Sequence, residues 1–432
     1  MSDCDLVVGY GVHAWGLPHH ANGVVTYTAT LVPAIREAGA KAYVVASEVA
    51  PEARDRWVAT LPDWQTGCSP LKRAWIKLSS RCAPQRTSVR LNAAMTARAV
   101  SRLQREAGLQ LFEIEDSQGT AGWLHRWTDV PVVTRIHGPW FTTGMMVQGV
   151  TRRGFRARVR REYASFTQVA GVSAVSHDVL RRVREHYGLE LREAVVIPNP
   201  IALAAAEHRW SPVGCDPQRI LFVGRFDRHK GGDIMIRAFA RVLQHQPQAK
   251  LTFAGPDRGC IDDAGRIWSL PQFVERYLPE PWMRGRFEWL GVRSPAEVAA
   301  LRRACFVSVL ASRYECFPMV ALEAMATGCP VIAPDVGGIS EMIRHERNGL
   351  LFRAGDPDSL AEAIIRLMSR PAMAESLGTQ ALLDAAAQYS PATVALRTLE
   401  FYHQVLERRQ PPGRHASRRK RIEPTDMPCP TA

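Results

Sequence analysis

The chain has 432 residues, of which 46% are hydrophobic and 22% charged. This length predicts two or three domains, and the composition excludes a disordered, collagen-like or fibrous protein. The 55 Lys and Arg against 42 Asp and Glu give a net charge of +13, which favours anionic partners. The nine cysteines form no C-x-x-C pair, so neither a disulfide framework nor a structural zinc site is expected.

Short apolar runs alternate with amphipathic segments along the chain, which predicts parallel β-sheets covered by helices on both faces. In the first half the expected strands are Leu6–Val8, Ala42–Ala46, Leu111–Ile114, Val132–Ile136, Gln168–Val172 and Val195–Ile197. A linker rich in Pro and Gly follows, and a second alternating set begins after it. Its expected strands are Ile220–Val223, Lys250–Ala254, Phe287–Leu290, Cys305–Leu310 and Pro330–Ala333.

Helices are expected between these strands and after them. The predicted segments include Gly23–Ala38, Val179–Tyr187, Ile234–Leu243 and Pro391–Arg408. No run reaches the roughly 18 apolar residues of a membrane-spanning helix, and the first residues lack the pattern of a secretory signal. We therefore expect a cytoplasmic protein.

Basic residues gather in two internal clusters and in the last residues of the chain. No acidic residue lies between Trp64 and Arg105. The basic residues of that first cluster are Lys72, Arg73, Lys77, Arg81, Arg86, Arg90, Arg98, Arg102 and Arg105. The second runs from Arg152 to Arg161, with Phe155 and Val159 between its arginines. Arginine beside apolar residues suits an anionic membrane surface, although a charge run is more often a solvated face.

One motif in the second half is typical of phosphate binding. From Val223 the sequence reads V-G-R-F-D-R-H-K-G-G, directly after a predicted strand and before a predicted helix. The glycines allow backbone N–H groups to approach an anion, and Arg225 and Lys230 supply two cations. The same residues could instead form an ordinary basic turn.

A second motif places two carboxylates at the start of another predicted helix. Glu315 precedes Pro318, and Glu323 lies eight residues after Glu315 inside an apolar helix. Ionised carboxylates accept hydrogen bonds from vicinal hydroxyls, which sugar nucleotides carry on the hexose and on the ribose. The alternative is that Glu323 only forms a salt bridge, although its apolar flanks predict a buried carboxylate that needs a partner.

Taken together, V-G-R-x-x-x-x-K-G, the E-x7-E pair and the following P-V-I-A-x-x-V-G-G-x-x-E resemble a retaining GT-B glycosyltransferase of family 4, also described as glycosyl transferases group 1. The segments G-V-S-A-V-S and V-V-I-P-N-P, which precede the linker, extend the similarity upstream. The resemblance covers roughly Leu6 to Leu406 and is strongest from Gly171 to Phe352.

The resemblance implies an α/β fold of two doubly wound, Rossmann-like domains that face each other across a cleft. Residues 1–200 would bind the acceptor, with a helix at about 391–409 packing back on them. Residues 215–390 would bind the nucleotide sugar, and residues 410–432 would form a disordered basic tail.

Site residues are implied in the same way. Arg225 and Lys230 would bind the donor diphosphate, Glu315 the hydroxyls of the transferred sugar, and Glu323 those of the ribose. Backbone N–H groups around Phe317, Met319 and Val320, at a helix N-terminus, would complete the phosphate site. No metal or other cofactor is expected, because two cations and a helix dipole can stabilise the leaving diphosphate.

The first half would supply the acceptor side of the cleft. His137, at the end of a strand, matches the family's active-site histidine, and with Glu315 it forms the expected catalytic pair. Asn22 and Gly23 replace the Gly-Gly that the family commonly has in its amino-terminal loop, near the donor phosphates. Glu115 and Asp116 follow a strand and could meet the acceptor, although they could equally be carboxylates of a solvated loop.

The implied reaction transfers a sugar from a nucleoside diphosphate sugar to the hydroxyl of a glycan, lipid-linked or small-molecule acceptor, with retention of configuration. Such a reaction would serve the synthesis of cell-surface glycans or glycolipids, in the cytoplasm or at the inner face of the membrane. For this family the acceptor attacks from the face that the diphosphate leaves, and the departing phosphate takes the acceptor proton.

Two alternative enzyme functions remain. A sugar-nucleotide epimerase would share the architecture but need no acceptor. The G-Y-G-V-H-A segment that starts at Gly9 formally matches a dinucleotide-binding turn, so an NAD-dependent oxidoreductase is a second alternative, although Gly16 and Pro18 interrupt the helix that should follow. Nucleic acid binding is not expected, because the basic clusters lack the spacing of known nucleic-acid motifs.

Overall fold

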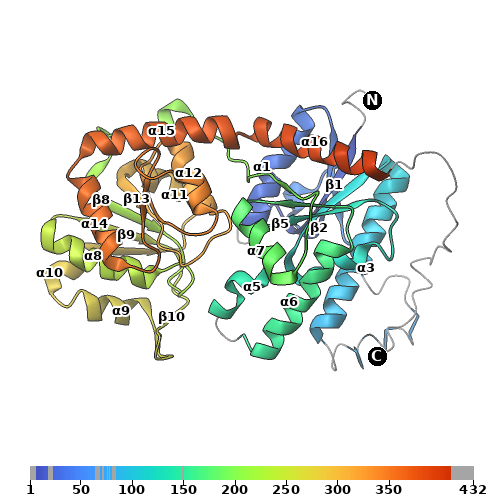
Figure 1. The fold of residues 1–432 in the computed structure, drawn as a ribbon, viewed down its shortest axis with the longest axis horizontal. Coiled ribbons are helices and arrows are strands. Elements are labelled where there is room, and N and C mark those ends of the chain that lie inside the picture. The colour runs from blue at the N-terminus through green and yellow to red at the C-terminus, as the bar shows by residue number, and fades with distance from the viewer. Residues whose placement is uncertain are drawn as a thin grey trace.

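The computed structural model describes residues 6–17, 23–63, 69, 70, 73, 74, 76, 78, 79, 84–147 and 150–409. These residues form two lobes, each built on a parallel β-sheet with helices on both faces (Figure 1). Asn22, most of the segment from 64 to 83, and the predicted tail 410–432 lie outside the described residues.

The amino-terminal lobe contains seven parallel strands in the order β3-β2-β1-β4-β5-β6-β7. The strands are β1 (Val7–Trp15), β2 (Lys41–Val49), β3 (Val58–Thr60), β4 (Leu111–Glu115), β5 (Val132–Ile136), β6 (Gly171–Ala174) and β7 (Val195–Val196). The helices are α1 (Gly23–Glu37), α3 (Pro84–Ala107), α4 (Ala121–Leu124), α5 (Trp140–Thr143), α6 (Arg152–Thr167) and α7 (His177–Tyr187).

The carboxy-terminal lobe contains six parallel strands in the order β12-β9-β8-β13-β14-β15, and a separate hairpin of β10 and β11. The strands are β8 (Asp216–Val223), β9 (Lys250–Ala254), β10 (Cys260–Ile261), β11 (Ile267–Trp268), β12 (Phe287–Gly291), β13 (Cys305–Val309), β14 (Val331–Pro334) and β15 (Leu350–Phe352). The helices are α8 (Gly232–His245), α9 (Leu270–Tyr277), α10 (Pro281–Arg284), α11 (Pro295–Ala304), α12 (Met319–Thr327), α13 (Ile339–Met342), α14 (Pro357–Met368) and α15 (Pro371–Tyr389). A last helix, α16 (Pro391–Arg409), follows α15.

Apolar residues on both faces of each sheet form the cores. In the amino-terminal lobe, α1 packs on one face and α3 and α4 on the other. In the carboxy-terminal lobe, α8, α9 and α14 cover one face, and α12 and α15 cover the other. This arrangement leaves the carboxyl ends of both sheets to form loops, where ligands of doubly wound folds bind.

Two connections join the lobes. The first is the segment between β7 and β8, where Arg135 Nη2 donates to the carbonyl oxygens of Ile197 and Pro198, at 2.7 and 3.1 Å. The second is the turn from α15 into α16. These two helices together run along one side of both lobes (Figure 1). Helix α16 packs on α1, and its Tyr402 hydroxyl donates to the buried Glu113 carboxylate at 2.9 Å. Helix α16 is therefore part of the amino-terminal core.

The segment that formally matched a dinucleotide-binding turn is a strand. Gly9 and Gly11 both lie inside β1, which continues to Trp15. A Cβ atom on Gly9 would lie 2.9 Å from the Phe112 ring, and one on Gly11 would lie 2.8 Å from it. The two glycines therefore make room for Phe112, a residue of the neighbouring strand β4. The oxidoreductase alternative loses its sequence basis, because no strand-to-helix turn occurs at these positions.

Most predicted elements occur with shifted ends. The strand expected at 168–172 is instead β6, at Gly171–Ala174, because α6 continues to Thr167 and a turn follows it. Strand β1 extends seven residues beyond its predicted end at Val8. The short strands β3, β10, β11 and β15 were not predicted, since each has only two or three residues.

Candidate functional site

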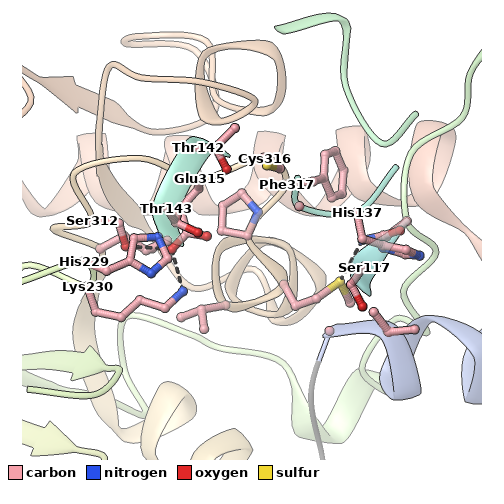
Figure 2. A pocket seen from close by; sticks show the side chains of 18 of the residues that line it. Ser117, His137, Thr142, Thr143, His229, Lys230, Ser312, Glu315, Cys316 and Phe317 are labelled. Atoms are coloured by element: carbon pink, nitrogen blue, oxygen red, sulfur yellow. Dashed lines mark hydrogen bonds and ion pairs between the residues drawn. The ribbon is translucent and has the colours of Figure 1, made fainter. Parts of the chain in front are cut away.

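A cavity of about 520 Å³ lies between the two lobes. From the amino-terminal lobe it is lined by the start of α1 and by residues that follow β4 and β5. From the carboxy-terminal lobe it is lined by the loop after β8 and by the segment from β13 into α12. Figure 2 shows Lys230, His229, Ser312 and Glu315 together on one side, with His137 and Ser117 on the other.

The turn after β8 positions Lys230. The Asp227 carboxylate accepts the Lys230 backbone N–H at 2.7 Å, and this bond closes the turn. Gly231 then adopts φ 69°, where a Cβ atom would lie 1.8 Å from the Ala311 carbonyl oxygen. Only glycine fits so close to the Ala311 backbone. The glycine that follows Lys230 in the predicted motif is therefore required for steric reasons. Lys230 consequently faces the cavity.

Lys230 and Glu315, which the sequence assigned to separate roles, form an ion pair in the wall of the cavity. Lys230 Nζ lies 2.5 Å from Glu315 Oε1, and the Ser312 hydroxyl donates to the same oxygen at 2.7 Å. Burial alone would raise the pKa of Glu315, but the charges of Lys230 and His229 and these hydrogen bonds lower the pKa below its usual value. Glu315 is therefore ionised at neutral pH and accepts hydrogen bonds.

Neither Arg225 nor Glu323 lines the cavity. Arg225 is 45% exposed, and its Nε lies 2.6 Å from Asp227 Oδ2. Glu323 is 34% exposed and lies 2.5 Å from the Arg302 guanidinium, which is itself 3% exposed. The carboxylate has the partner that its apolar surroundings require, and that partner comes from α11.

His137 lines the opposite wall with Asp116 and Glu115. The His137 backbone N–H donates to Asp116 Oδ1 at 2.9 Å, and its ring packs edge-on against Tyr27. Burial and the nearby charge of Arg135 lower the pKa of His137 well below its usual value, so its imidazole is neutral. This wall therefore presents a neutral ring at the point where β5 ends.

The carboxyl group of Asp116 is fully buried beneath His137. Burial, together with the negative charge of Glu162, raises the pKa of Asp116 to about 8. Its Oδ2 atom has no hydrogen-bond partner among the residues that the structure describes. Burial also raises the pKa of Glu115, although the Ser117 hydroxyl donates to it at 2.5 Å. Both groups favour the protonated form more than carboxylates in water do.

Two helix N-termini face the cavity. Gly23 begins α1, and Phe317, Met319 and Val320 lie at the start of α12; all four line the cavity. The first N–H groups of a helix lack intrahelical partners and favour an anion. Asn22 lies outside the described residues.

Some lining residues were missed from the sequence as site candidates. They are Ser312, Cys316, Thr142, Thr143 and Asn199. Ser312 could have been found from its position three residues before Glu315. The threonines lie on the short helix α5, which no periodic pattern marks.

Among the described residues, no group of three or more His, Cys, Asp or Glu side chains could hold a metal ion. In the same ranges, no helix is both long and apolar enough to cross a bilayer.

Comparisons with known proteins cover both lobes. Residues 21–205 match the family model described as Glycosyltransferase Family 4, and residues 206–383 match the one described as Glycosyl transferases group 1. The chain belongs to this glycosyltransferase family. It is 33% identical over 192 residues to an uncharacterized glycosyltransferase of Methanocaldococcus jannaschii, a match that covers 44% of this chain and 46% of that relative. The chain thus spans about half the length of this curated relative.

Solved structures show the fold of the family. Sucrose-phosphate synthase from Thermosynechococcus elongatus has a TM-score of 0.68 and 20% identity, over 93% of this chain and all of that one. The Anabaena protein HepE in complex with UDP-glucose has a TM-score of 0.66 and 17% identity, over 92% of this chain and all of that one. The predicted GT-B fold, with two doubly wound domains, is thereby confirmed.

Proposed function

We propose that the protein transfers a sugar from a nucleoside diphosphate sugar to an acceptor hydroxyl, with retention of anomeric configuration. The observation that carries the proposal is the cavity between the lobes. There, the ion pair of Lys230 and Glu315 lies beside the start of α12 and opposite the neutral ring of His137. A cation and a helix N-terminus suit a diphosphate, and an ionised carboxylate suits sugar hydroxyls.

The donor would lie against the carboxy-terminal lobe. Lys230 and the first N–H groups of α12 would bind the diphosphate, and Glu315 would accept hydrogen bonds from the transferred sugar. Arg225 would have to turn from Asp227 to reach the diphosphate, which its 45% exposure allows. Glu323 would bind the ribose only if its free oxygen faces the nucleoside, because Arg302 occupies Oε2. The complex of HepE with UDP-glucose supports a uridine nucleotide as the first donor to test.

The acceptor would enter from the amino-terminal lobe, along Glu115, Ser117 and the threonines of α5. Its hydroxyl oxygen would form a bond to the anomeric carbon as the bond from that carbon to the phosphate oxygen breaks. The proton of the hydroxyl would pass to the departing phosphate, whose developing charge Lys230 stabilises. The neutral His137 would contact the sugar without competing for that proton.

A membrane-bound acceptor is consistent with one surface of the amino-terminal lobe. Arg153, Arg156 and Arg160 of α6 are exposed, and so are Met145 (54%) and Val147 (42%), which precede α6 in the chain. We propose that this surface binds anionic lipid headgroups at the inner face of the membrane. The first basic cluster lies partly outside the described residues: Arg73 and the members on α3 are described, whereas Lys72, Lys77 and Arg81 are not.

Transfer is tested by screening sugar nucleotides for thermal stabilisation and then supplying radiolabelled donor with membrane extracts. A ligand at 100 times its dissociation constant stabilises the folded protein by about 2.7 kcal/mol. Glu315→Gln should abolish label transfer, whereas Glu362→Gln, at an exposed position of α14, should not. The anomeric configuration of the product, measured by NMR, tests retention. An isomerised soluble sugar formed without acceptor would instead support the epimerase alternative.

Lipid binding is tested with the double variant Arg153→Glu/Arg156→Glu on vesicles of increasing anionic lipid content. The variant should lose binding, and salt should weaken the wild type. Arg370→Glu/Arg397→Glu changes the charge equally at exposed positions away from α6 and is the matched control. Wild-type binding that is indifferent to both lipid charge and salt would reject this part of the proposal.

A further inference from the structure

Glu315 belongs to the carboxy-terminal lobe, but both of its neighbours in the chain are buried in the other lobe. Tyr314 and Cys316 are 4% and 7% exposed. They pack in a core cluster that contains Ile136, Val172 and Val179 of the amino-terminal lobe. The position of the Glu315 carboxylate therefore depends on contact between the lobes.

The ring of Tyr314 is fixed by the first turns of α7. Its hydroxyl donates to Asp178 Oδ2 at 2.9 Å, and the Arg182 guanidinium lies 4.5 Å from its ring centroid. Arg182 also donates to Asp178 Oδ2, at 2.8 Å. Tyr314 thus contacts a preformed pair of charges on the other lobe.

A second contact comes from the motif V-G-G-x-x-E, which has no role in the proposed site. The two carboxylate oxygens of Glu341 accept the backbone N–H groups of His177 and Asp178, at 2.8 and 2.7 Å. These residues begin α7, so a carboxylate of one lobe binds the helix N-terminus of the other. Such N–H groups have no partner within the helix, and the helix dipole favours an anion there.

The glycines of the same motif connect this contact to Glu315. The Gly338 N–H donates to the Glu315 carbonyl oxygen at 3.0 Å. A Cβ atom on Gly337 would lie 2.2 Å from the Glu315 carbonyl oxygen, and one on Gly338 would lie 1.8 Å from that of Cys316. The segment can pack directly on the backbone of the Glu315 loop only because it has no side chains there.

We propose that Glu341 and Tyr314 are positioning residues, which hold the Glu315 loop against α7 and so bring Glu315 into register with His137. The role of Glu315 toward the sugar rests on the proposed function, whereas the contacts that hold the Glu315 loop do not depend on it. Glu341 is exposed, so water can replace its two hydrogen bonds when the lobes separate. The contact therefore forms and breaks with lobe closure and favours the closed form, in which both walls of the cavity are present.

The test combines kinetics with hydrogen exchange on the full chain. In Glu341→Ala, kcat should fall about tenfold, because fewer complexes reach the closed form. The dissociation constant of UDP should change by less than about twofold, because Lys230 and the start of α12 are intact. Amides in residues 176–182 and 312–317 should exchange faster.

Two further variants refine the test. Glu341→Gln keeps one acceptor oxygen and should recover part of the lost kcat. Tyr314→Phe should lower kcat while preserving the packing of the ring.

Ser340→Ala is the matched control, because the Ser340 hydroxyl lies on the same helix but bonds only Asp335 within its own lobe. It should leave kcat and exchange unchanged. Unaltered exchange at both segments in Glu341→Ala would overturn the inference, as would a loss of kcat accompanied by an equal loss of UDP binding. If the wild type transfers no sugar from any donor, the proposed function fails, while the exchange measurement still decides whether Glu341 holds the lobes together.

Discussion

The two walls of the cavity handle charge in opposite ways. The carboxy-terminal wall keeps Glu315 ionised by pairing it with Lys230, and Ser312 adds a hydrogen bond. The amino-terminal wall holds His137 and Asp116 in forms that burial drives toward neutrality. A charged wall suits an anionic donor, and a neutral wall suits hydroxyl groups that must not lose their protons early. The division follows from pairing on one side and burial on the other, not from which residue types are present.

The largest expected effect comes from breaking the pair on the charged wall. Lys230→Ala should lower kcat by about 10² to 10³, the loss typical of removing one group that stabilises developing charge. It should also destabilise the fold by about 3 kcal/mol, since Glu315 is left buried without its partner. Steady-state transfer and urea unfolding measure the two losses.

The double variant Lys230→Met/Glu315→Gln separates these losses. It should recover much of the stability, because no unpaired charge remains, but none of the activity. Recovery of both would show that the pair only supports the fold.

A second contrast lies within the carboxy-terminal lobe, between Glu315 and Glu323. Glu323→Ala leaves the buried Arg302 unpaired and should cost about 2 to 3 kcal/mol of unfolding free energy. Glu323→Gln keeps a hydrogen-bond acceptor and should cost less. Donor KM measured on the glutamine variant tests the ribose contact; an unchanged KM would leave Glu323 with the structural role alone.

The neutral wall can be tested through pH. Because the pKa of Asp116 is raised to about 8, the folded state binds a proton that the unfolded state releases near pH 4. Wild-type stability should therefore fall, relative to Asp116→Asn, as the pH rises from about 4 to about 8, by at most about 1.4 kcal/mol per pH unit. Above pH 8 the difference should stay constant. Urea unfolding of both proteins from pH 5 to 9 measures it, and a difference that does not change with pH would contradict the raised pKa.

The smallest effect on stability is expected at Arg225. Its pair with Asp227 is half-exposed, so Arg225→Ala should change the unfolding free energy by less than about 1 kcal/mol. If Arg225 turns toward the diphosphate, donor KM should still rise several-fold, and Arg209→Ala, at an exposed position of the linker, should not raise it. An unchanged KM would place Arg225 outside the site, where its side chain now lies.

The sequence predicts this fold well because its signals are local. The alternation of strands and helices, and the turn from Val223 to Gly231, each depend on residues close together in the chain. Lys230 and Glu315 were each accessible as site candidates because each lies in its own motif, but the ion pair between them was not predicted. The partner of Glu323 was not, since Arg302 lies on a separate helix and no pattern marks it.

Burial is what the sequence could not supply at the site. Asp116 follows a strand and could be a solvated loop residue, yet it is 0% exposed, and Glu162 of α6 and Cys316 of the other lobe lie close enough to interact with its charge. The glycines of β1 look like a phosphate-binding turn, and only the packing of Phe112 against them shows why they are small. The burial of Asp116 and the role of the β1 glycines both depend on contacts between segments far apart in the chain.

The route of α16 also orders the events of synthesis. Glu113 is buried among Tyr27 and Tyr402, and the second tyrosine leaves the ribosome almost three hundred residues after the carboxylate it satisfies. The amino-terminal lobe is translated first but lacks part of its interior until α16 has been translated. The carboxy-terminal lobe, whose sheet draws all its strands from one continuous stretch, can reach its native packing earlier.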